Sequence, residues 1–263
     1  KSKFSKALDF GVPIISIGNL TLGGSGKTPL GIAILSEFDG GCVVLRGYGR
    51  ASQGLVKVAV SGEILVGVTA SGDEAMEYAK SVKNANVIVS ENRDIAINEA
   101  KKMGAKYVLL DDGFGKFHIK KFNVLIRPSA KPYFDFVLPS GAYRYPSKFY
   151  AKADYVVKEG EDFTRESEII NQTTKMVLVT AIANPQRLEP YFSLCVGRDI
   201  YPDHYAFSRD ELASILERYA ATSLLVTRKD AVKMEEFGLP LSVIALKTTL
   251  AGKFKRIIKE KIL

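Results

Sequence analysis

A glycine-rich segment followed by lysine and threonine has the residue types and spacing that most clearly indicate chemistry. It follows the apolar residues 12–17 directly. A buried strand, a glycine-rich turn and a helix that begins with lysine and threonine form the arrangement that binds nucleotide phosphates. The Lys27 ammonium neutralises the β- and γ-phosphates, and the Thr28 hydroxyl can ligate Mg²⁺. We therefore predict a nucleotide site formed by Thr21, Leu22, Gly23, Gly24, Ser25, Gly26, Lys27 and Thr28.

The segment departs from the usual phosphate-loop pattern, GxxxxGK[ST], at its first glycine, where this sequence has Thr21. The later glycines are present, so the departure leaves the chemistry intact. Leu22 stands where related ATPases that dimerise over nucleotide carry an additional lysine, which counts against that group. The alternative is a chance glycine turn between a strand and a helix.

Two adjacent carboxylates, Asp111 and Asp112, end the apolar residues 107–110. A strand that ends in an aspartate supplies the Mg²⁺-directed carboxylate of phosphate-loop enzymes. Neighbouring strand residues point to opposite faces, so we expect different roles for the two acids. We assign Asp111 to the metal, directly or through water, and expect Asp112 to hold a second group. The sequence does not by itself decide which of them meets Mg²⁺.

Four further residues have side chains suited to phosphate transfer. Asp73 begins a predicted helix, where a carboxylate can cap the first turn or, close to the γ-phosphate, accept the proton of an attacking hydroxyl. His204 lies in a turn before another helix, a position at which histidine is more often structural than catalytic. Arg46 and Arg50 flank a glycine turn, which can be a solvated loop, but their spacing favours contact with a phosphorylated substrate.

The composition bounds the class of protein and its partners. The 263 residues are 46% hydrophobic, enough for one large core or two moderate ones. The net charge of +8 indicates an anionic partner, which can be nucleic acid, an anionic membrane face or a phosphorylated acceptor. Few aromatic residues accompany the basic ones, so we expect no nucleic acid. No apolar run is long enough to span a bilayer. The two cysteines, Cys42 and Cys195, suit reduced thiols of a cytosolic protein. We expect a monomer.

Short apolar runs that alternate with longer amphipathic ones predict an α/β fold with mainly parallel strands. We expect strands near residues 12–17, 42–46, 86–90, 106–110, 122–127, 154–158, 176–181, 191–196, 223–227 and 242–246. We expect helices near residues 28–37, 73–82, 92–103, 184–189, 208–220, 228–236 and 250–260. So many strands exceed one comfortable open sheet, so we predict a phosphate-loop lobe over residues 1–150 and a second lobe over residues 151–263.

Two segments have alternative interpretations. Residues 55–66 are predicted to form a β-hairpin inserted after the second strand, where it can shape an acceptor pocket or merely decorate the surface. Residues 250–263 place apolar residues at helical spacing beside five basic ones. They can form a membrane-surface helix or, with slightly more support, a terminal helix whose apolar side packs on the core, which can be that of the first lobe.

Together these motifs resemble one family, the tetraacyldisaccharide 4′-kinases of lipid A biosynthesis. The likeness runs in family order through residues 12–15, 18–21, 23–29, 46–50, 72–74, 111–114, 138–139, 184–185, 202–204 and 229–231. The ordered set covers most of the chain and is far more specific than any single motif.

The resemblance implies transfer of the ATP γ-phosphate to the 4′-hydroxyl of a disaccharide lipid 1-phosphate at the cytoplasmic face of the bacterial inner membrane. It implies a phosphate-loop lobe of three α/β/α layers and a second, smaller α/β/α lobe, joined by a short β linker. An N-terminal hydrophobic helix normally precedes the loop in that family and helps to hold the enzyme on the membrane. Only its final part, near residues 1–10, is expected here.

The family's functional residues match this sequence position by position. Its base matches Asp73, its paired acids match Asp111 and Asp112, and its second-lobe histidine matches His204. The resemblance thus implies that His204 completes the site when the lobes close, and that Asp112 and His204 orient or tune Asp73. Residues 115–116 are Gly-Lys, where the family usually has Gln and then His or Asn, which puts those side-chain contacts in doubt.

Two other functions are consistent with parts of the sequence. One is a phosphate-loop ATPase that uses hydrolysis as a switch for a membrane or protein partner, against which Leu22 argues. The other is a basic nucleotide-sensing adaptor, which leaves the coincidence of the carboxylates with His204 unexplained.

Overall fold

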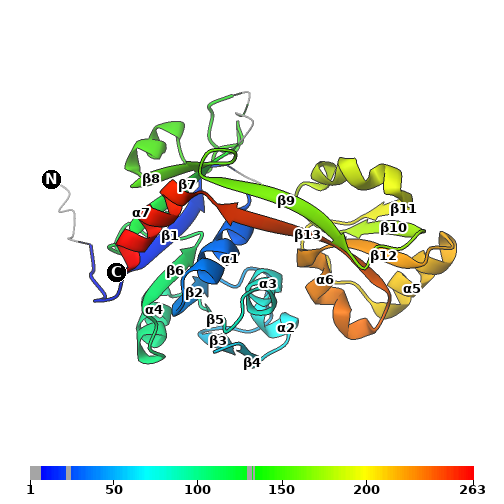
Figure 1. Cartoon of the computed structure of the whole chain (residues 1–263), viewed down its shortest axis with the longest axis horizontal. Coiled ribbons are helices and arrows are strands. Elements are labelled where there is room, and N and C mark those ends of the chain that lie inside the picture. Colours follow the sequence, from blue (N-terminus) through cyan, green and yellow to red (C-terminus); the bar gives the residue numbers. More distant parts are fainter. Residues whose placement is uncertain (1–6, 22–24, 129–131, 133) are drawn as a thin grey trace.

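The protein consists of two α/β lobes joined by a pair of long strands (Figure 1). The structure, a computed structural model, describes residues 7–21, 25–128, 132 and 134–263. The first sheet has eight strands in the order β4-β3-β5-β2-β6-β1-β7-β8, and the second has five in the order β11-β10-β12-β13-β9. The fold class predicted from the sequence is therefore confirmed.

The first sheet is built around strands whose residues are buried on both faces, as central parallel strands require. β1 pairs with β6 and β7 in parallel, and β2 pairs in parallel with β5 and β6. The strands are β1 (Ile14–Asn19), β2 (Gly41–Leu45), β3 (Val56–Val60), β4 (Glu63–Ile64), β5 (Asn86–Val89), β6 (Tyr107–Asp111), β7 (Phe122–Arg127) and β8 (Tyr155–Lys158).

Helices cover both faces of this sheet. α1 (Lys27–Glu37), α3 (Asp73–Ser81) and α7 (Gly252–Ile262) bury apolar side chains in the core cluster on one face. α4 (Arg93–Lys102) packs on the other face through Ala96, Ile97 and Ala100. The short α2 (Val68–Ser71) precedes α3. These layers give the three-layer α/β/α lobe that the family resemblance implies.

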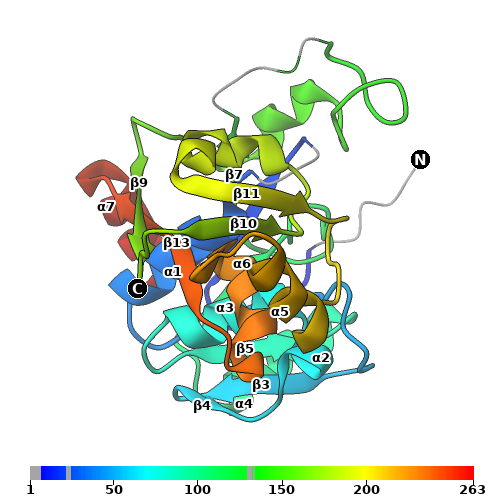
Figure 2. The ribbon, with the colours of Figure 1, turned by 90° about the vertical axis from the view of Figure 1, so that its right-hand side faces the viewer.

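The second lobe has the same layering on a smaller scale. α5 (Arg209–Arg218) and α6 (Arg228–Met234) pack on one face of its sheet, and the 3-10 segment Pro185–Leu194 packs on the other (Figure 2). Its strands are β9 (Phe163–Ile170), β10 (Met176–Thr180), β11 (Cys195–Ile200), β12 (Ser223–Thr227) and β13 (Leu241–Leu250). Further 3-10 turns lie at Ser147–Lys152 and Glu235–Phe237.

β9 and β13 link the lobes as an antiparallel pair that runs from Val243 opposite Ile170 to Leu250 opposite Phe163. Figure 1 shows both strands extending from the second lobe to the first, where α7 follows β13. The chain therefore passes from the first sheet to the second between β8 and β9. The domain boundary that we predict after residue 150 stays a prediction. The interlobe position of β13 is what returns α7 to the first lobe.

Several predicted elements differ from the structure. Strand 191–196 is wrong in place, because residues up to Leu194 are 3-10 and β11 begins at Cys195. β9 was not predicted, because Phe163–Ile170 mixes charged and apolar residues with mostly exposed side chains. α7 buries Phe254 and Ile258 completely, which favours the core-packing interpretation of the C-terminal segment.

The inserted hairpin is present as β3 and β4, which pair antiparallel and extend the edge of the first sheet. Among the described residues, those that line the large cleft between the lobes include none from the hairpin. Of its two interpretations, the structure favours the surface decoration, here an extension of the sheet edge.

Candidate active site

The phosphate-loop segment has the strand–turn–helix geometry that its sequence predicts. Gly26 has a left-handed backbone, with φ of 85°, and α1 begins at Lys27. Nζ of Lys27 donates a hydrogen bond to Oδ1 of Asn19 at 3.0 Å, while Nδ2 of Asn19 donates to the carbonyl oxygen of Thr21 at 2.6 Å. Asn19 thus fixes both the loop and the lysine. Its place in the motif is visible in the sequence, but its role becomes clear only in the structure.

The predicted nucleotide-binding residues occupy different places. Ser25, Gly26, Lys27 and Thr28 line a cleft of about 1450 Å³ between the lobes. Thr21 is buried and its backbone bridges to Tyr143, outside the cleft lining. The remaining three predicted residues, Leu22, Gly23 and Gly24, lie outside the described part of the chain.

The cleft lining, drawn from both lobes, contains ten Lys and Arg and seven Asp and Glu side chains among the described residues, so basic groups are in excess. Its cationic side chains are Lys27, Arg46, Arg93, Arg144, Arg165, Arg187, Arg228, Lys229, Lys247 and Lys255. Low-dielectric walls concentrate such a positive potential, which favours polyanionic ligands. The cleft therefore suits a nucleotide triphosphate together with a second phosphorylated molecule.

Asp111 ends β6 within the cleft and is almost completely buried. Its Oδ2 accepts a hydrogen bond from the Tyr78 hydroxyl at 3.0 Å, whereas Oδ1 has no partner among the described residues. Burial, helped by the nearby Glu74 charge, raises the pKa of Asp111 to about 7, although Lys27 opposes this. A buried carboxylate oxygen without a partner is the acceptor that a cation would satisfy.

Asp112 points to different partners, as expected for the second residue of the pair. Its Oδ2 accepts a hydrogen bond from Nη1 of Arg144 at 2.9 Å, and its Oδ1 lies 3.8 Å from Nζ of Lys27. Its backbone is left-handed, with φ of 52°. The strand thus ends abruptly here and turns this carboxylate toward the phosphate-loop lysine.

Arg93 and Arg144 are functional candidates that sequence reasoning missed. Arg93 is buried beneath Asp111, donating to the Ser90 carbonyl at 2.7 Å and the Asp111 carbonyl at 3.3 Å. Burial lowers its pKa to about 10. The signal available in the sequence was only a basic residue at a helix start and another within residues 129–148, which are rich in Pro, Tyr and Ser.

Asp73 and His204 meet across the lobes although 131 residues separate them. Nδ1 of His204 lies 3.0 Å from Oδ2 and 3.2 Å from Oδ1 of Asp73. Burial alone would raise the pKa of Asp73, but the hydrogen bond with His204 and the Lys229 charge outweigh it and hold that pKa below its usual value. The same hydrogen bond raises the pKa of His204.

Lys229 organises this pair from the start of α6. Its Nζ lies 3.7 Å from Oδ2 of Asp73, 3.0 Å from Oδ1 of Asp203 and 3.4 Å from Nε2 of His204. An ammonium group only donates hydrogen bonds, so a neutral His204 accepts at Nε2 and carries its proton on Nδ1, directed at Asp73. The family motif at 229–231 therefore has a structural reason that its sequence did not reveal.

A buried carboxylate, Asp230, holds these second-lobe residues in place. It is fully buried and accepts hydrogen bonds from the hydroxyls of Thr180 and Thr227, each at 2.9 Å. The adjacent Ala181 carbonyl accepts from the backbone N–H of His204 at 3.2 Å. The end of β10, the start of α6 and the histidine turn thus form one fixed unit.

The two arginines predicted to contact substrate differ in position. Arg46 is exposed and lines the cleft, next to the glycine turn whose Tyr48 ring lies 5.0 Å from the His204 ring. Arg50 instead donates to Glu91 and the Gly54 carbonyl, each at 2.5 Å, and is not in the cleft lining. Asp112 contacts Arg144 and Lys27 rather than Asp73 or His204.

Comparison with known proteins gives the same assignment for the whole chain. The family model described as tetraacyldisaccharide-1-P 4′-kinase matches residues 1–173 and 161–263. The chain belongs to this family. The resemblance inferred from the motifs is confirmed, and with it the assignment to ATP-dependent kinases.

Relatives and a solved structure support this family assignment. Tetraacyldisaccharide 4′-kinase from Campylobacter jejuni (strain NCTC 11168) is 48% identical over 261 residues, which are 98% of this chain and 84% of the relative. The Helicobacter pylori (strain 26695) enzyme of that name is 47% identical over 264 residues, covering 100% and 84%. The crystal structure of LpxK from Aquifex aeolicus, an "apo" form in complex with ATP, has a TM-score of 0.80 and 25% identity, covering 99% of this chain and 91% of that one.

Among the described residues, none of the helices has the length and apolar character needed to cross a bilayer.

Proposed function

We propose that this member of the family transfers the γ-phosphate of ATP to the 4′-hydroxyl of a tetraacyldisaccharide 1-phosphate. The observation that carries the proposal is the contact of Asp73 with His204, which lines the same cleft as phosphate-loop residues 25–28. A base completed by the second lobe has a clear purpose when a hydroxyl on a second substrate must be deprotonated beside ATP.

Asp111 and Thr28 fit a magnesium ion bound together with the ATP phosphates. The free, buried Oδ1 of Asp111 and the hydroxyl of Thr28 are oxygen donors of the kind that Mg²⁺ prefers. The described residues contain no group of three or more His, Cys, Asp and Glu that could hold a metal, which suits an ion that keeps few protein ligands and binds substrate phosphates. When bound, Mg²⁺ would neutralise charge on the transferring phosphoryl group.

In the proposed reaction, Asp73 accepts the proton of the 4′-hydroxyl as its oxygen forms a bond to the γ-phosphorus. The bond from the γ-phosphorus to the β,γ-bridging oxygen breaks, and ADP leaves. His204 donates from Nδ1 to Asp73 and so holds its carboxylate ionised and oriented, while Lys229 fixes the histidine. Lys27 and Arg144, gathered by Asp112, would stabilise charge on the phosphates.

Arg46 is our candidate for binding the acceptor, since it faces the cleft near the histidine turn. Arg50 stays a prediction as a second acceptor contact, with its side chain engaged by Glu91 in this structure. The predicted orienting role of Asp112 toward Asp73 likewise stays a prediction.

A label-transfer assay tests the proposed function directly. γ-Labelled ATP is incubated with the chain and a tetraacyldisaccharide 1-phosphate in detergent micelles, with Lys27→Ala as the inactive comparison. We expect labelled lipid from the parent and none from the variant. Labelled inorganic phosphate without labelled lipid would overturn the kinase proposal and favour the switch ATPase.

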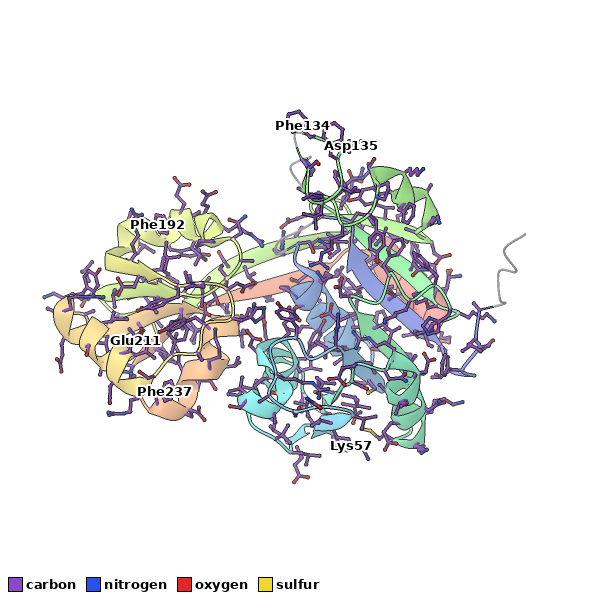
Figure 3. All side chains as sticks on the ribbon, turned by 180° about the vertical axis from the view of Figure 1, so that it is seen from behind. Lys57, Phe134, Asp135, Phe192, Glu211 and Phe237 are labelled. Atoms are coloured by element: carbon purple, nitrogen blue, oxygen red, sulfur yellow. The ribbon has the colours of Figure 1, made fainter. Side chains whose placement is uncertain are left out.

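We also propose that the chain works at a membrane surface, at the cytoplasmic face of the inner membrane, as a monomer that binds no nucleic acid. The acceptor is a lipid, and Phe134, Phe136 and Leu138 are 56%, 57% and 47% exposed. Phe134 and Asp135 lie on a loop that projects from the first lobe (Figure 3). Exposed aromatic side chains on a basic protein suit the interface of an anionic bilayer.

Flotation with anionic phospholipid vesicles tests this membrane contact. We expect Phe134→Ser/Phe136→Ser to bind vesicles several-fold more weakly than the parent, whereas Val196→Ser, an exposed position on the second lobe, keeps parental binding. Equal flotation of all three proteins would contradict a role for this loop.

A further inference from the structure

Arg165 extends from the interlobe strands to the phosphate loop. It lies on β9 opposite Thr248 of β13. A methyl group in place of a hydrogen on Gly26 would collide with its Nη1 and would lie 3.3 Å from its Cζ. The guanidinium therefore rests directly on the glycine that begins α1, and it lines the cleft together with Lys27.

The guanidinium of Arg165 is held so that one of its arms stays free. Its Nε donates to Oε1 of Glu159 at 2.7 Å, and its Nη2 donates to Oε2 of the same carboxylate. Nη1 is buried and has no hydrogen-bond partner among the described residues. A buried charged donor without an acceptor is costly, so its persistence at a binding cleft indicates a ligand atom that completes it.

We infer that Nη1 of Arg165 donates a hydrogen bond to a phosphate oxygen of the nucleotide bound at the phosphate loop. This inference rests on the proposed nucleotide site. It adds to that site one phosphate-binding side chain, which comes from the strands that link the lobes. The choice of the nucleotide over the acceptor phosphate follows from Gly26, because backbone N–H groups at this turn are the ones that contact nucleotide phosphates. Sequence patterns could not reveal this contact, since β9 lies far from the loop along the chain.

The position of Arg165 also gives nucleotide binding a mechanical consequence. β9 and β13 are the two strands that join the lobes, and β13 continues into α7 on the first lobe. A phosphate held by Arg165 therefore ties the nucleotide to the linker itself. The bidentate pair with Glu159 fixes the direction of the free arm, as forked arginine–carboxylate pairs do.

Isothermal titration with ATP, in the absence of acceptor, tests this inference. We expect Arg165→Met to weaken ATP binding by about tenfold or more, as loss of a charged hydrogen bond predicts. Arg165→Lys keeps the charge but loses the fork, so its affinity is expected between the two. Arg198→Met, which removes one exposed positive charge from the second lobe outside the cleft, is the matched control and should bind as the parent does.

Two further measurements separate a direct phosphate contact from an indirect effect of the substitution. Arg165→Met also removes a cation that faces Glu159, so Arg165→Met/Glu159→Gln is measured too, and we expect it to bind ATP as weakly as Arg165→Met. Recovery of parental affinity in the double variant would overturn the inference. Unchanged ATP affinity in Arg165→Met together with a raised KM for the acceptor would also overturn the inference, because Nη1 of Arg165 would then contact the acceptor phosphate.

The ATP-binding measurements are independent of the transfer reaction. ATP affinity is measured without acceptor, so a failure of the proposed lipid kinase activity would leave the result for Arg165 readable. Parental ATP binding in every Arg165 variant would contradict the inference alone.

Discussion

Asp73 and Asp111 are two buried carboxylates that differ in how their charge is balanced; Asp111 lines the cleft, and Asp73 contacts His204, which lines it too. They are 5% and 4% exposed, so burial disfavours the charged form of both. Asp73 nevertheless has a lowered pKa, because His204 and Lys229 of the second lobe face it. Asp111 has a pKa raised to about 7, because burial and Glu74 outweigh the influence of Lys27.

The difference assigns the two acids to different tasks. The chain supplies the cations that Asp73 needs, and it supplies them only where the lobes meet. The neighbours of Asp111 among the described residues leave one of its oxygens without a partner. A bound cation is therefore needed to balance the negative charge of its carboxylate. An ionised base and a metal-directed carboxylate are the pair of functions that this contrast supports.

Among changes at the residues that surround these two acids, removal of His204 should give the largest effect. We expect His204→Ala to lower kcat by about 10- to 100-fold, because Asp73 loses the donor that orients it. Turnover in detergent micelles at saturating ATP measures the change. In an Asp73→Ala background the same substitution should add little, since residues that act as a unit are not additive. Independent, multiplying losses would contradict a shared role.

A change at Lys229 should alter the pH dependence of the reaction. Lys229→Met removes a charge that lowers the pKa of Asp73, so that pKa rises and the base is protonated at higher pH. We expect the ratio of variant to parent kcat/KM to fall as the assay pH is lowered, because Asp73 of the variant becomes protonated at a higher pH than Asp73 of the parent. A ratio that stays constant with pH would mean that Lys229 has only a structural role.

Stability should respond in opposite directions at the two acids. For Asp111 the folded pKa of about 7 exceeds its ordinary value of 3.8, so the free energy of unfolding falls as the pH rises between them. For Asp73 the folded pKa is below 3.8, so its contribution is present at neutral pH and is lost as the pH falls through that lowered pKa. At a pH of about 8 without Mg²⁺, we expect Asp111→Asn to stabilise and Asp73→Asn to destabilise, each by on the order of 1 kcal/mol.

Urea unfolding of both variants and the parent at a pH of about 8 and of about 5 measures this contrast. The stabilisation by Asp111→Asn should shrink at the lower pH, where the parental carboxyl is already protonated. Changes of the same sign at the two acids would show that their environments do not differ as described.

The smallest effect is expected at the two arginines of the glycine turn. Arg46→Met should raise the acceptor KM several-fold with little change in stability, because the side chain is exposed in the cleft. Arg50→Met should mainly lower stability, by about 1 kcal/mol, because it loses hydrogen bonds to Glu91 and the Gly54 carbonyl. Acceptor kinetics and thermal unfolding distinguish the two, and a larger KM effect at Arg50 would reverse their assignment.

The elements near the phosphate loop could be predicted because their signals are local. Apolar residues, glycines and the Lys27–Thr28 pair specify β1, the turn and α1 without reference to the rest of the chain. β9 could not be predicted, because its pairing with β13 comes from the arrangement of the lobes and its own residues are largely polar. β11 was placed too early in the chain because Tyr191, Phe192 and Leu194, which belong to a 3-10 segment, have the apolar side chains expected at the start of a strand.

The site was predictable as a set of residues and much less as a set of contacts. Asp73, Asp111 and His204 were named from motifs, and the family resemblance predicted that His204 acts on Asp73. The structure adds the direct contact between them and the position of Lys229 beside both. Lys229 belongs to a motif whose role the sequence leaves open, and no local pattern points to Arg165, because each acts on residues far away in the sequence. Long-range contacts of this kind depend on how the second lobe sits over the first.

The most direct test of the central claim, that Asp73 is the base of a transfer reaction completed by the second lobe, is the single-turnover rate of Asp73→Asn. ATP is bound to parent and variant before the tetraacyldisaccharide 1-phosphate is added, and labelled lipid is followed with time. We predict a transfer rate lower by on the order of 10²-fold or more, with unchanged ATP affinity. A variant that binds ATP and transfers phosphate at nearly the parental rate would contradict the account.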